Sequence, residues 1–372
     1  MKISNFTNSL DNNFNLIRII AAFAVLVTHS FPLALGIGKA EPISNYLSRT
    51  IGSIAVDIFF LTSGFLVTAS FLSRQSTIQF IWARALRIFP ALFVMLVVSV
   101  LGLGLFFTTV PLSVYFTDSL TYKYFFKCLT LFSGVSFQLP GVFENNPYKY
   151  AVNGSLWSLP HEVKLYALLA FIGLLLRVTV GYRLKLFKIM FISGVLITGV
   201  LVGLVHFQII SGDINLLRLY YMFFTGGAFF LFKERIVLSK KMFNLALAFL
   251  LVAMFNEHIF FFIYLATIAY ILFFFAYVPS GVIRKYNKLG DYSYGVYIYA
   301  WPVQQSTAEL IPGISVLAMI IISSSITLML AVISWHLLEK YALKFKGKYG
   351  NSPGKSVDWF YPQYGLPTDA DI

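Results

Sequence analysis

Charged residues are scarce in this chain of 372 residues. They account for 12% of the sequence, whereas soluble proteins contain about 25%. Hydrophobic residues reach 58%, and the mean hydropathy is +0.79. Because so few charges cannot cover a surface in contact with water, a soluble globular protein is excluded. The composition predicts an all-α, polytopic membrane protein.

Cysteine is almost absent as well. Cys128 is the single cysteine, which excludes an intramolecular disulfide and a cysteine-based metal site. The five histidines lack the paired spacing of metal ligands, so no metal is expected. A net charge of +13 would suggest nucleic acid in a soluble protein. In a membrane protein the basic residues belong in cytoplasmic loops instead, and no nucleic-acid partner is predicted.

Long hydrophobic runs fill most of the sequence. A helix that crosses a lipid bilayer needs about 20 mostly apolar residues. By this measure we predict ten transmembrane helices, at residues 15–35, 51–72, 88–109, 155–177, 189–207, 216–232, 238–256, 258–278, 292–311 and 313–338. Residues 110–150 are expected to form an outer loop with an interfacial helix.

The basic residues support this segmentation. With the N-terminus inside, the inner segments hold 20 Lys and Arg residues and the outer segments hold 5. The positive-inside rule therefore predicts a multi-pass protein of the inner (plasma) membrane with both termini cytoplasmic. Residues 1–350 are expected to form one integral-membrane domain, and residues 351–372 a short, disordered cytoplasmic tail.

Ionisable side chains inside membrane spans are costly, so each one suggests a functional site. Arg18 and His29 are eleven positions apart in the first span. This spacing places them on one helix face, about 16 Å apart along the axis. Their shared face favours a joint function. The alternatives are a snorkelling anchor for Arg18 and a hydrogen-bonded packing role for His29.

Two carboxylates are predicted at the depth of His29. Counted from the outer ends of their spans, Asp57 and Glu162 each lie about 9–10 Å below the outer surface. A carboxylate beside an imidazole fixes its tautomer and raises its basicity, which suits a general base. The alternative for both carboxylates is a structural ion pair with Arg or Lys in the bundle.

Two further features bear on the site and the packing. Arg84 and Arg87 are three positions apart, so they share a helix face near the inner end of the third span. They are suited to hold phosphates, and anchoring by the positive-inside rule is an equal alternative.

The pair Gly226-Gly227 most simply allows close packing of helices.

Together these residues resemble the acyltransferase-3 family of integral-membrane O-acyltransferases. The resemblance runs over about residues 14–346 and rests on four stretches in the right order. They are Arg18 and His29, which match an Arg–ten residues–His pattern; VDIFFLTSGF at 56–65; NGSLWSLPHEVKLY at 153–166; and the endings at 292–303 and 334–340. Ala300 stands where the family often has His, and His336 stands where an aromatic residue is usual.

The resemblance implies transfer of an acyl group, usually acetyl, from cytoplasmic acyl-CoA to a hydroxyl of an outer-facing glycan or lipid-linked sugar. Arg18, Arg84 and Arg87 would then hold the coenzyme, and His29, with Glu162 and Asp57, would act in catalysis. His29 would serve either as a general base or as a transient acyl acceptor. Two competing hypotheses remain: a secondary transporter or flippase for a lipid-linked sugar, and a sensor or scaffold that carries out no chemistry. The sequence does not indicate the oligomeric state.

Overall fold

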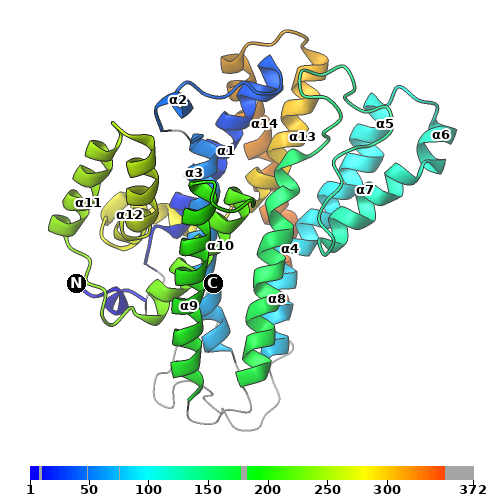
Figure 1. Cartoon of the computed structure of the whole chain (residues 1–372). Helices are drawn as coiled ribbons and strands as arrows, with labels where there is room; N and C mark the ends of the chain where they lie inside the picture. Colours follow the sequence, from blue (N-terminus) through cyan, green and yellow to red (C-terminus); the bar gives the residue numbers. More distant parts are fainter. Residues whose placement is uncertain (8–10, 48, 75, 177–181, 348–372) are drawn as a thin grey trace.

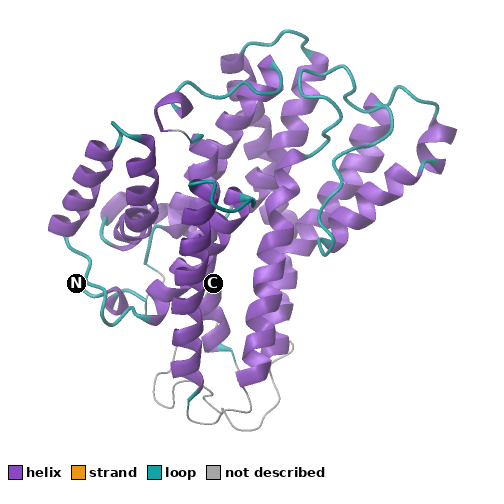
Figure 2. Cartoon of the chain, viewed as in Figure 1, coloured by secondary structure: helices purple, strands orange, loops and turns teal. Residues whose placement is uncertain are grey.

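The computed structural model describes residues 1–7, 11–47, 49–74, 76–176 and 182–347. Within these ranges the chain is built from helices joined by loops and contains no β-strand (Figure 2). The all-α class predicted from the sequence is therefore confirmed. The predicted tail at 351–372 lies outside the described residues.

Eight helical segments of the described chain are long and apolar enough to cross a membrane. Six of them are α1 (Phe14–Leu35), α3 (Ile51–Ser73), η3 with α8 (Gly154–Leu175), α9 (Arg183–His206), α10 (Ile214–Leu231) and α12 (Glu257–Tyr277). The third in chain order joins α4 (Thr77–Val97) to η2 (Val98–Leu103) and α5 (Gly104–Phe107), and the last joins α14 (Val316–Ser334) to η6 (Trp335–Glu339) and α15 (Lys340–Lys344).

Polar side chains at the loop ends help to start these helices. The hydroxyl of Thr50 accepts a hydrogen bond from the Ser53 amide at 3.0 Å at the start of α3. Asp213 caps α10 and Asn256 caps α12 in the same way. Because the first amides of a helix have no partner within it, such caps mark where each apolar run begins.

The predicted count of ten spans is not confirmed, because two predicted spans differ from the other eight. The helix α11 (Lys240–Ala253) has 14 residues, which is short for a crossing. The helix α13 (Ser293–Leu310) has 18 residues but is too polar to be recognised by hydropathy. It is buried along most of its length and packs against α1 and α14 (Figure 1), so protein rather than lipid surrounds its polar groups.

No further crossing helix lies between residues 110 and 150, all of which are described. This stretch contains α6 (Leu112–Thr117) and α7 (Ser119–Thr130), with 6 and 12 residues. Both are far shorter than the bilayer requires. The sequence-based prediction of a loop without an additional span is therefore confirmed.

The helices α3 and α10 pack backbone to backbone through glycine. A Cβ atom on Gly64 would lie 2.0 Å from the carbonyl oxygen of Phe223, and one on Gly226 would lie 2.1 Å from that of Leu61. Neither position can hold a larger residue without moving a helix. The close packing predicted for Gly226 is thus confirmed, and it brings α10 against the helix that carries Asp57.

Two contacts fix the antiparallel register of α1 against α3. The Gly52 amide donates to the Thr28 hydroxyl at 2.8 Å near one end. The rings of Phe14 and Phe65 lie 5.8 Å apart near the other end. Position 29 of α1 therefore faces the first turn of α3, which sets the relative depth of every polar residue on these two helices.

Candidate functional site

A cavity of about 80 Å³ lies where α1, α3, α4, α8 and α13 meet. Its wall combines three guanidinium groups with one carboxylate and several hydroxyls. The charged and polar lining includes Arg18, Arg84, Arg87, Glu162, Ser63 and Tyr166. The three arginines selected from the sequence thus come together in one place, and they do so within a membrane domain.

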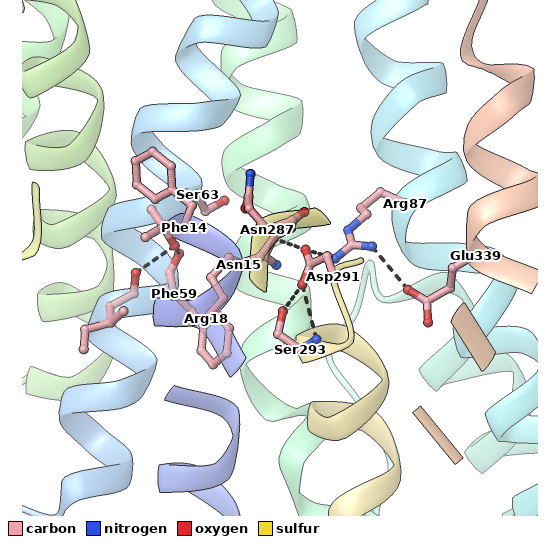
Figure 3. A network of polar contacts seen from close by, with 12 residues as sticks. Phe14, Asn15, Arg18, Phe59, Ser63, Arg87, Asn287, Asp291, Ser293 and Glu339 are labelled. Atoms are coloured by element: carbon pink, nitrogen blue, oxygen red, sulfur yellow. Dashed lines mark hydrogen bonds and ion pairs between the residues drawn. The ribbon is translucent and has the colours of Figure 1, made fainter. Parts of the chain in front are cut away.

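Two of these arginines share one carboxylate (Figure 3). Nη1 of Arg18 and Nη2 of Arg87 each lie 2.5 Å from Oδ2 of Asp291, in the loop just before α13. Ser293 donates its backbone amide and its hydroxyl to the other carboxylate oxygen. Asp291 therefore ties the start of α1 to α4 and to the first turn of α13.

Asp291 lies outside the membrane-spanning segments, and its protonation follows from these contacts. Burial opposes its ionisation, but the charges of Arg18 and Arg87 and the hydrogen bonds from Ser293 outweigh burial and lower the pKa of the carboxyl to about 2. Asp291 is consequently an anion at physiological pH and a poor proton acceptor. Its role is to hold the two guanidinium groups in position.

A second carboxylate supports Arg87 from the last span. Nη1 of Arg87 lies 3.2 Å from Oε2 of Glu339, and the Ser334 hydroxyl donates to Oε1 of Glu339 at 3.0 Å. Glu339 ends η6, a stretch of π-helix within this span. Such wider turns are rare and concentrate at functional sites, and here the turn contains the carboxylate that binds Arg87.

Arg84 has a different environment from its two neighbours in the cavity. Among the described residues it makes no hydrogen bond or ion pair, and its Nε atom is buried without a partner. Its guanidinium lies 6.0 Å from the centre of the Tyr166 ring. A partly buried cation without a direct partner is unfavourable, which makes Arg84 the best-placed group in the cavity to receive an anion.

Glu162 faces this same cavity from the start of α8. Its Oε1 atom accepts hydrogen bonds from the hydroxyls of Ser63, at 3.0 Å, and of Tyr166. The two hydroxyls are themselves 3.1 Å apart. The three side chains form one compact polar cluster on the wall of the cavity, in contact with the space that the arginines surround.

Asp57 belongs to another cluster, between α3, α10 and α12. Its Oδ1 atom lies 2.9 Å from Nε of Arg218, and the Tyr264 hydroxyl donates to Oδ2 at 2.7 Å. The side chains of Asp57 and Arg218 are 0% and 3% exposed. The sequence allowed two roles for Asp57: a carboxylate beside His29, or one half of a structural ion pair. The structure shows the ion pair, with Arg218 as the partner.

His29 is separated from both carboxylates. Its ring meets the Trp301 ring edge to face, with centroids 4.7 Å apart, and its Nδ1 atom is buried without a hydrogen-bond partner. No hydrogen bond among the described residues joins His29 to Asp57 or Glu162. The structure therefore places the imidazole against an aromatic wall rather than beside an acid.

The prediction of one shared layer for His29, Asp57 and Glu162 does not hold. His29 faces the first turn of α3, so Asp57 lies about 9 Å farther along that helix. Ser63, and with it Glu162, lies about 18 Å farther. The ends of the apolar runs do not share one depth, because α1 extends beyond the level at which α3 begins.

The fourth span, formed by η3 and α8, begins farther inside the helix bundle than the start of its apolar run indicates. The chain before η3 folds inward, where the Asn153 side-chain amide donates to the Ile298 carbonyl of α13 at 2.8 Å. The Trp301 indole donates to the Ala151 carbonyl at 2.8 Å. Because this loop is held against α13, α8 starts inside the bundle and Glu162 reaches the arginine cavity.

Sequence reasoning missed Asp291 and Ser63 as parts of the site. Asp291 had a detectable signal, because Arg18 and Arg87 require nearby anions and acidic residues are few in this chain. Ser63 had a weaker signal, as a hydroxyl six residues after Asp57 on a predicted span. Among the described residues, no three His, Cys, Asp or Glu side chains are arranged to hold a metal.

Comparison with known proteins identifies the family of this chain. Residues 11–338 match the acyltransferase-3 family, described as an acyltransferase domain. This chain belongs to that family, and it is a membrane-embedded O-acyltransferase. The resemblance inferred from the four sequence stretches is thus confirmed.

Two known proteins are similar to this chain. An "O-acetyl transferase" of Shigella phage Sf6 is 29% identical over 358 residues, which cover 93% of this chain and 99% of the relative. "Nodulation protein 10" of Rhizobium leguminosarum bv. viciae is 34% identical over 165 residues, 42% of each chain. No solved structure shows a significant match.

Proposed function

We propose that this protein transfers an acetyl group from cytoplasmic acetyl-CoA to a hydroxyl of an extracytoplasmic glycan or lipid-linked sugar, such as O-antigen or exopolysaccharide. The observation that carries the proposal is the cavity with three arginines in a membrane domain of this family. Guanidinium groups bind phosphates through paired, charge-assisted hydrogen bonds, and coenzyme A is rich in phosphate. The name of the phage relative supports acetyl as the group transferred.

The orientation of the cavity follows from the distribution of basic residues. The excess of basic residues in the predicted inner segments supports a cytoplasmic location, at the inner membrane, for both termini and for the ends of α1 and α4 that carry the arginines. The donor then enters the cavity from the cytoplasm. His29, about 16 Å farther along α1 than Arg18, lies toward the opposite face. An extended pantetheine arm spans a distance of this order.

In this arrangement the residues have separate roles. Arg18, Arg84 and Arg87 hold the phosphate end of the donor, and Glu162 contacts the donor within the cavity. His29 is the general base that removes the proton from the acceptor hydroxyl. The sugar oxygen then attacks the thioester carbonyl, and the coenzyme thiolate leaves with that proton. Asp57 positions helices through Arg218, and no metal takes part.

Donor binding requires the cavity to widen. A volume of about 80 Å³ admits only a few water molecules, whereas binding sites for small molecules measure about 300–1,000 Å³. Arg84 makes no hydrogen bond or ion pair among the described residues, so it can move without breaking one. Arg18 and Arg87 stay in place because Asp291 holds both.

The test uses purified protein in liposomes with acetyl-CoA labelled in its acetyl group. We expect release of free coenzyme thiol together with label on an added glycan acceptor, and loss of both in His29→Ala. Surface glycans of cells with and without the gene should differ in O-acetyl content. Transport of a lipid-linked sugar without any thiol release would instead support the transporter hypothesis.

A further inference from the structure

The cavity that contains the three arginines has two chemically different ends. Ser158 and Tyr166 both line it, and their positions along η3 and α8 place them about 12 Å apart on the helix axis. The Arg84 guanidinium lies at the Tyr166 end, 6.0 Å from the centre of that ring. At the other end the lining is Ser158 together with Tyr297 of α13. The cavity therefore joins a cationic region to a neutral region that offers hydroxyl groups.

Ser158 and Tyr297 are bonded to each other at this neutral end. Their hydroxyl oxygens are 2.8 Å apart, and the Tyr297 hydroxyl also donates to the Ser155 carbonyl. A hydroxyl has a single proton, and a backbone carbonyl can only accept, so the Tyr297 proton goes to Ser155. The Ser158 hydroxyl is then the donor in its bond with Tyr297.

These bonds leave the Ser158 oxygen as an acceptor that has no proton to offer. Ser158 is the N-cap residue of α8, a position where a serine hydroxyl usually accepts a hydrogen bond from a helix amide. In the described chain its side chain accepts no such bond, so its lone pairs are available. Because the residue is only 5% exposed, a ligand in the cavity gains most by bringing an N–H or O–H donor to this oxygen.

The neutral end also lies between the arginines and His29. Asp291, which binds two of the arginines, comes just before α13. Tyr297 follows on that helix, and one turn later Trp301 contacts the His29 ring, with centroids 4.7 Å apart. Along α13 the order is thus the arginine cluster, the hydroxyl pair and the histidine. Coenzyme A presents its phosphates, the amide groups of its arm and its thiol in the same order.

We infer that Ser158, oriented by Tyr297, binds an amide N–H of the coenzyme A arm. The inference rests on the proposed function, in which the arginines hold the phosphates of the donor and His29 acts near its thioester. An amide N–H is a donor of the kind that the Ser158 oxygen lacks. The contact fixes the arm at a point between its two ends, and thereby directs the thioester toward His29.

The experiment measures the binding of two ligands to the full-length protein in detergent by isothermal titration. Coenzyme A carries the arm, whereas 3′-phospho-ADP keeps phosphates and lacks the arm. We expect Ser158→Ala to weaken coenzyme A binding about fivefold, which corresponds to one neutral hydrogen bond of about 1 kcal/mol, and to leave 3′-phospho-ADP binding unchanged. Arg84→Gln should weaken the binding of both ligands, because both contain the phosphates.

The matched control is a serine outside the cavity. Ser323 is buried in α14, donates to the Met319 carbonyl of its own helix and is not part of the cavity lining. Ser323→Ala removes the same hydroxyl group in the same kind of surroundings. It should bind both ligands as the wild type does.

A modified ligand tests the direction of the hydrogen bond without any variant that must fold. Coenzyme A analogues with an ester in place of each amide in turn keep the carbonyl but lose the N–H. One of them should bind the wild type about fivefold less tightly than coenzyme A, and this difference should disappear in Ser158→Ala. Equal binding of coenzyme A and every analogue by the wild type overturns the inference.

The remaining outcomes separate the inference from the proposed function. Unchanged coenzyme A binding in a folded Ser158→Ala protein overturns the inference, and lost transfer in that protein would assign the Ser158 oxygen to a hydroxyl of the acceptor sugar instead. Equal weakening of both ligands overturns it as well, because Ser158 would then shape the cavity as a whole. A wild-type protein that binds neither coenzyme A nor 3′-phospho-ADP overturns the proposed function itself.

Discussion

The carboxylate of Asp291 lies 2.5 Å from the guanidinium of Arg18, although the two residues are 273 positions apart in the sequence. This ion pair connects the first span to the start of α13. The same carboxylate oxygen also binds Arg87. A single anion therefore aligns two of the three arginines that we assign to donor binding, while the third, Arg84, has no carboxylate partner in the described part of the chain.

Replacing Asp291 should destabilise the protein. Asp291→Asn leaves two largely buried guanidinium groups without their shared anion, and breaking a buried ion pair of this kind costs about 3–5 kcal/mol. We expect a lower Tm of the purified protein in detergent. The control is Asp118→Asn, which changes a carboxylate at the start of α7, remote from the cavity. Equal Tm values for Asp291→Asn and the wild type would show that the arginines need no counter-ion.

The pH dependence of this contribution has a definite sign. The pKa of Asp291 is lowered to about 2 in the folded protein, below its ordinary value of 3.8. Its contribution to stability is therefore complete above about pH 4 and is lost as the pH falls toward 2. The Tm difference between wild type and Asp291→Asn should be constant from pH 5 to pH 8 and should shrink below pH 4. A difference that disappears near neutral pH would contradict the assignment.

Arg84 and His29 should separate donor binding from turnover. Arg84→Gln removes a charge-assisted contact, worth about 1.5–3 kcal/mol, and should weaken coenzyme A binding about tenfold or more. His29→Ala should abolish transfer and leave coenzyme A binding near that of the wild type. Isothermal titration with coenzyme A and a thiol-release assay measure the two effects. Loss of coenzyme binding in His29→Ala would place the histidine in the donor site instead.

Substitutions at Asp57 distinguish a structural role of this buried carboxylate from a catalytic one. Asp57→Asn leaves the Arg218 charge buried without its anion, so the Tm should fall. The double variant Asp57→Asn with Arg218→Gln should recover part of that loss, because neither charge then remains. Thermal unfolding of the two single variants and the double variant completes the cycle. Full stability with lost transfer in Asp57→Asn would restore the catalytic role that the sequence suggested.

Some of this site can be predicted from the sequence because its determinants are local. The helix period places Arg18 and His29 on one face, and the three-residue spacing does the same for Arg84 and Arg87. The depth of Glu162 cannot be predicted in this way, since it depends on how the loop before α8 folds against α13. The sequence predicts a helix at 292–311, which corresponds to α13. The burial of α13 cannot be predicted from that run of residues, because it depends on how the other helices pack around it.

The contact between α3 and α10 gives the sharpest prediction about stability. A methyl group on Gly226 would lie 2.1 Å from the Leu61 carbonyl oxygen, so the two helices must separate to accept it. Overpacking of this kind costs about 1–3 kcal/mol, and we expect a clearly lower Tm for Gly226→Ala. Gly203→Ala is the matched control in α9. Its nearest neighbour, a ring carbon of Phe262, is 3.9 Å from the added Cβ, and alanine favours helix over glycine. The Tm of Gly203→Ala should therefore equal or exceed that of the wild type. A Gly226→Ala protein as stable as the control would mean that these helices can separate freely, and α10 would then not hold Arg218 against Asp57.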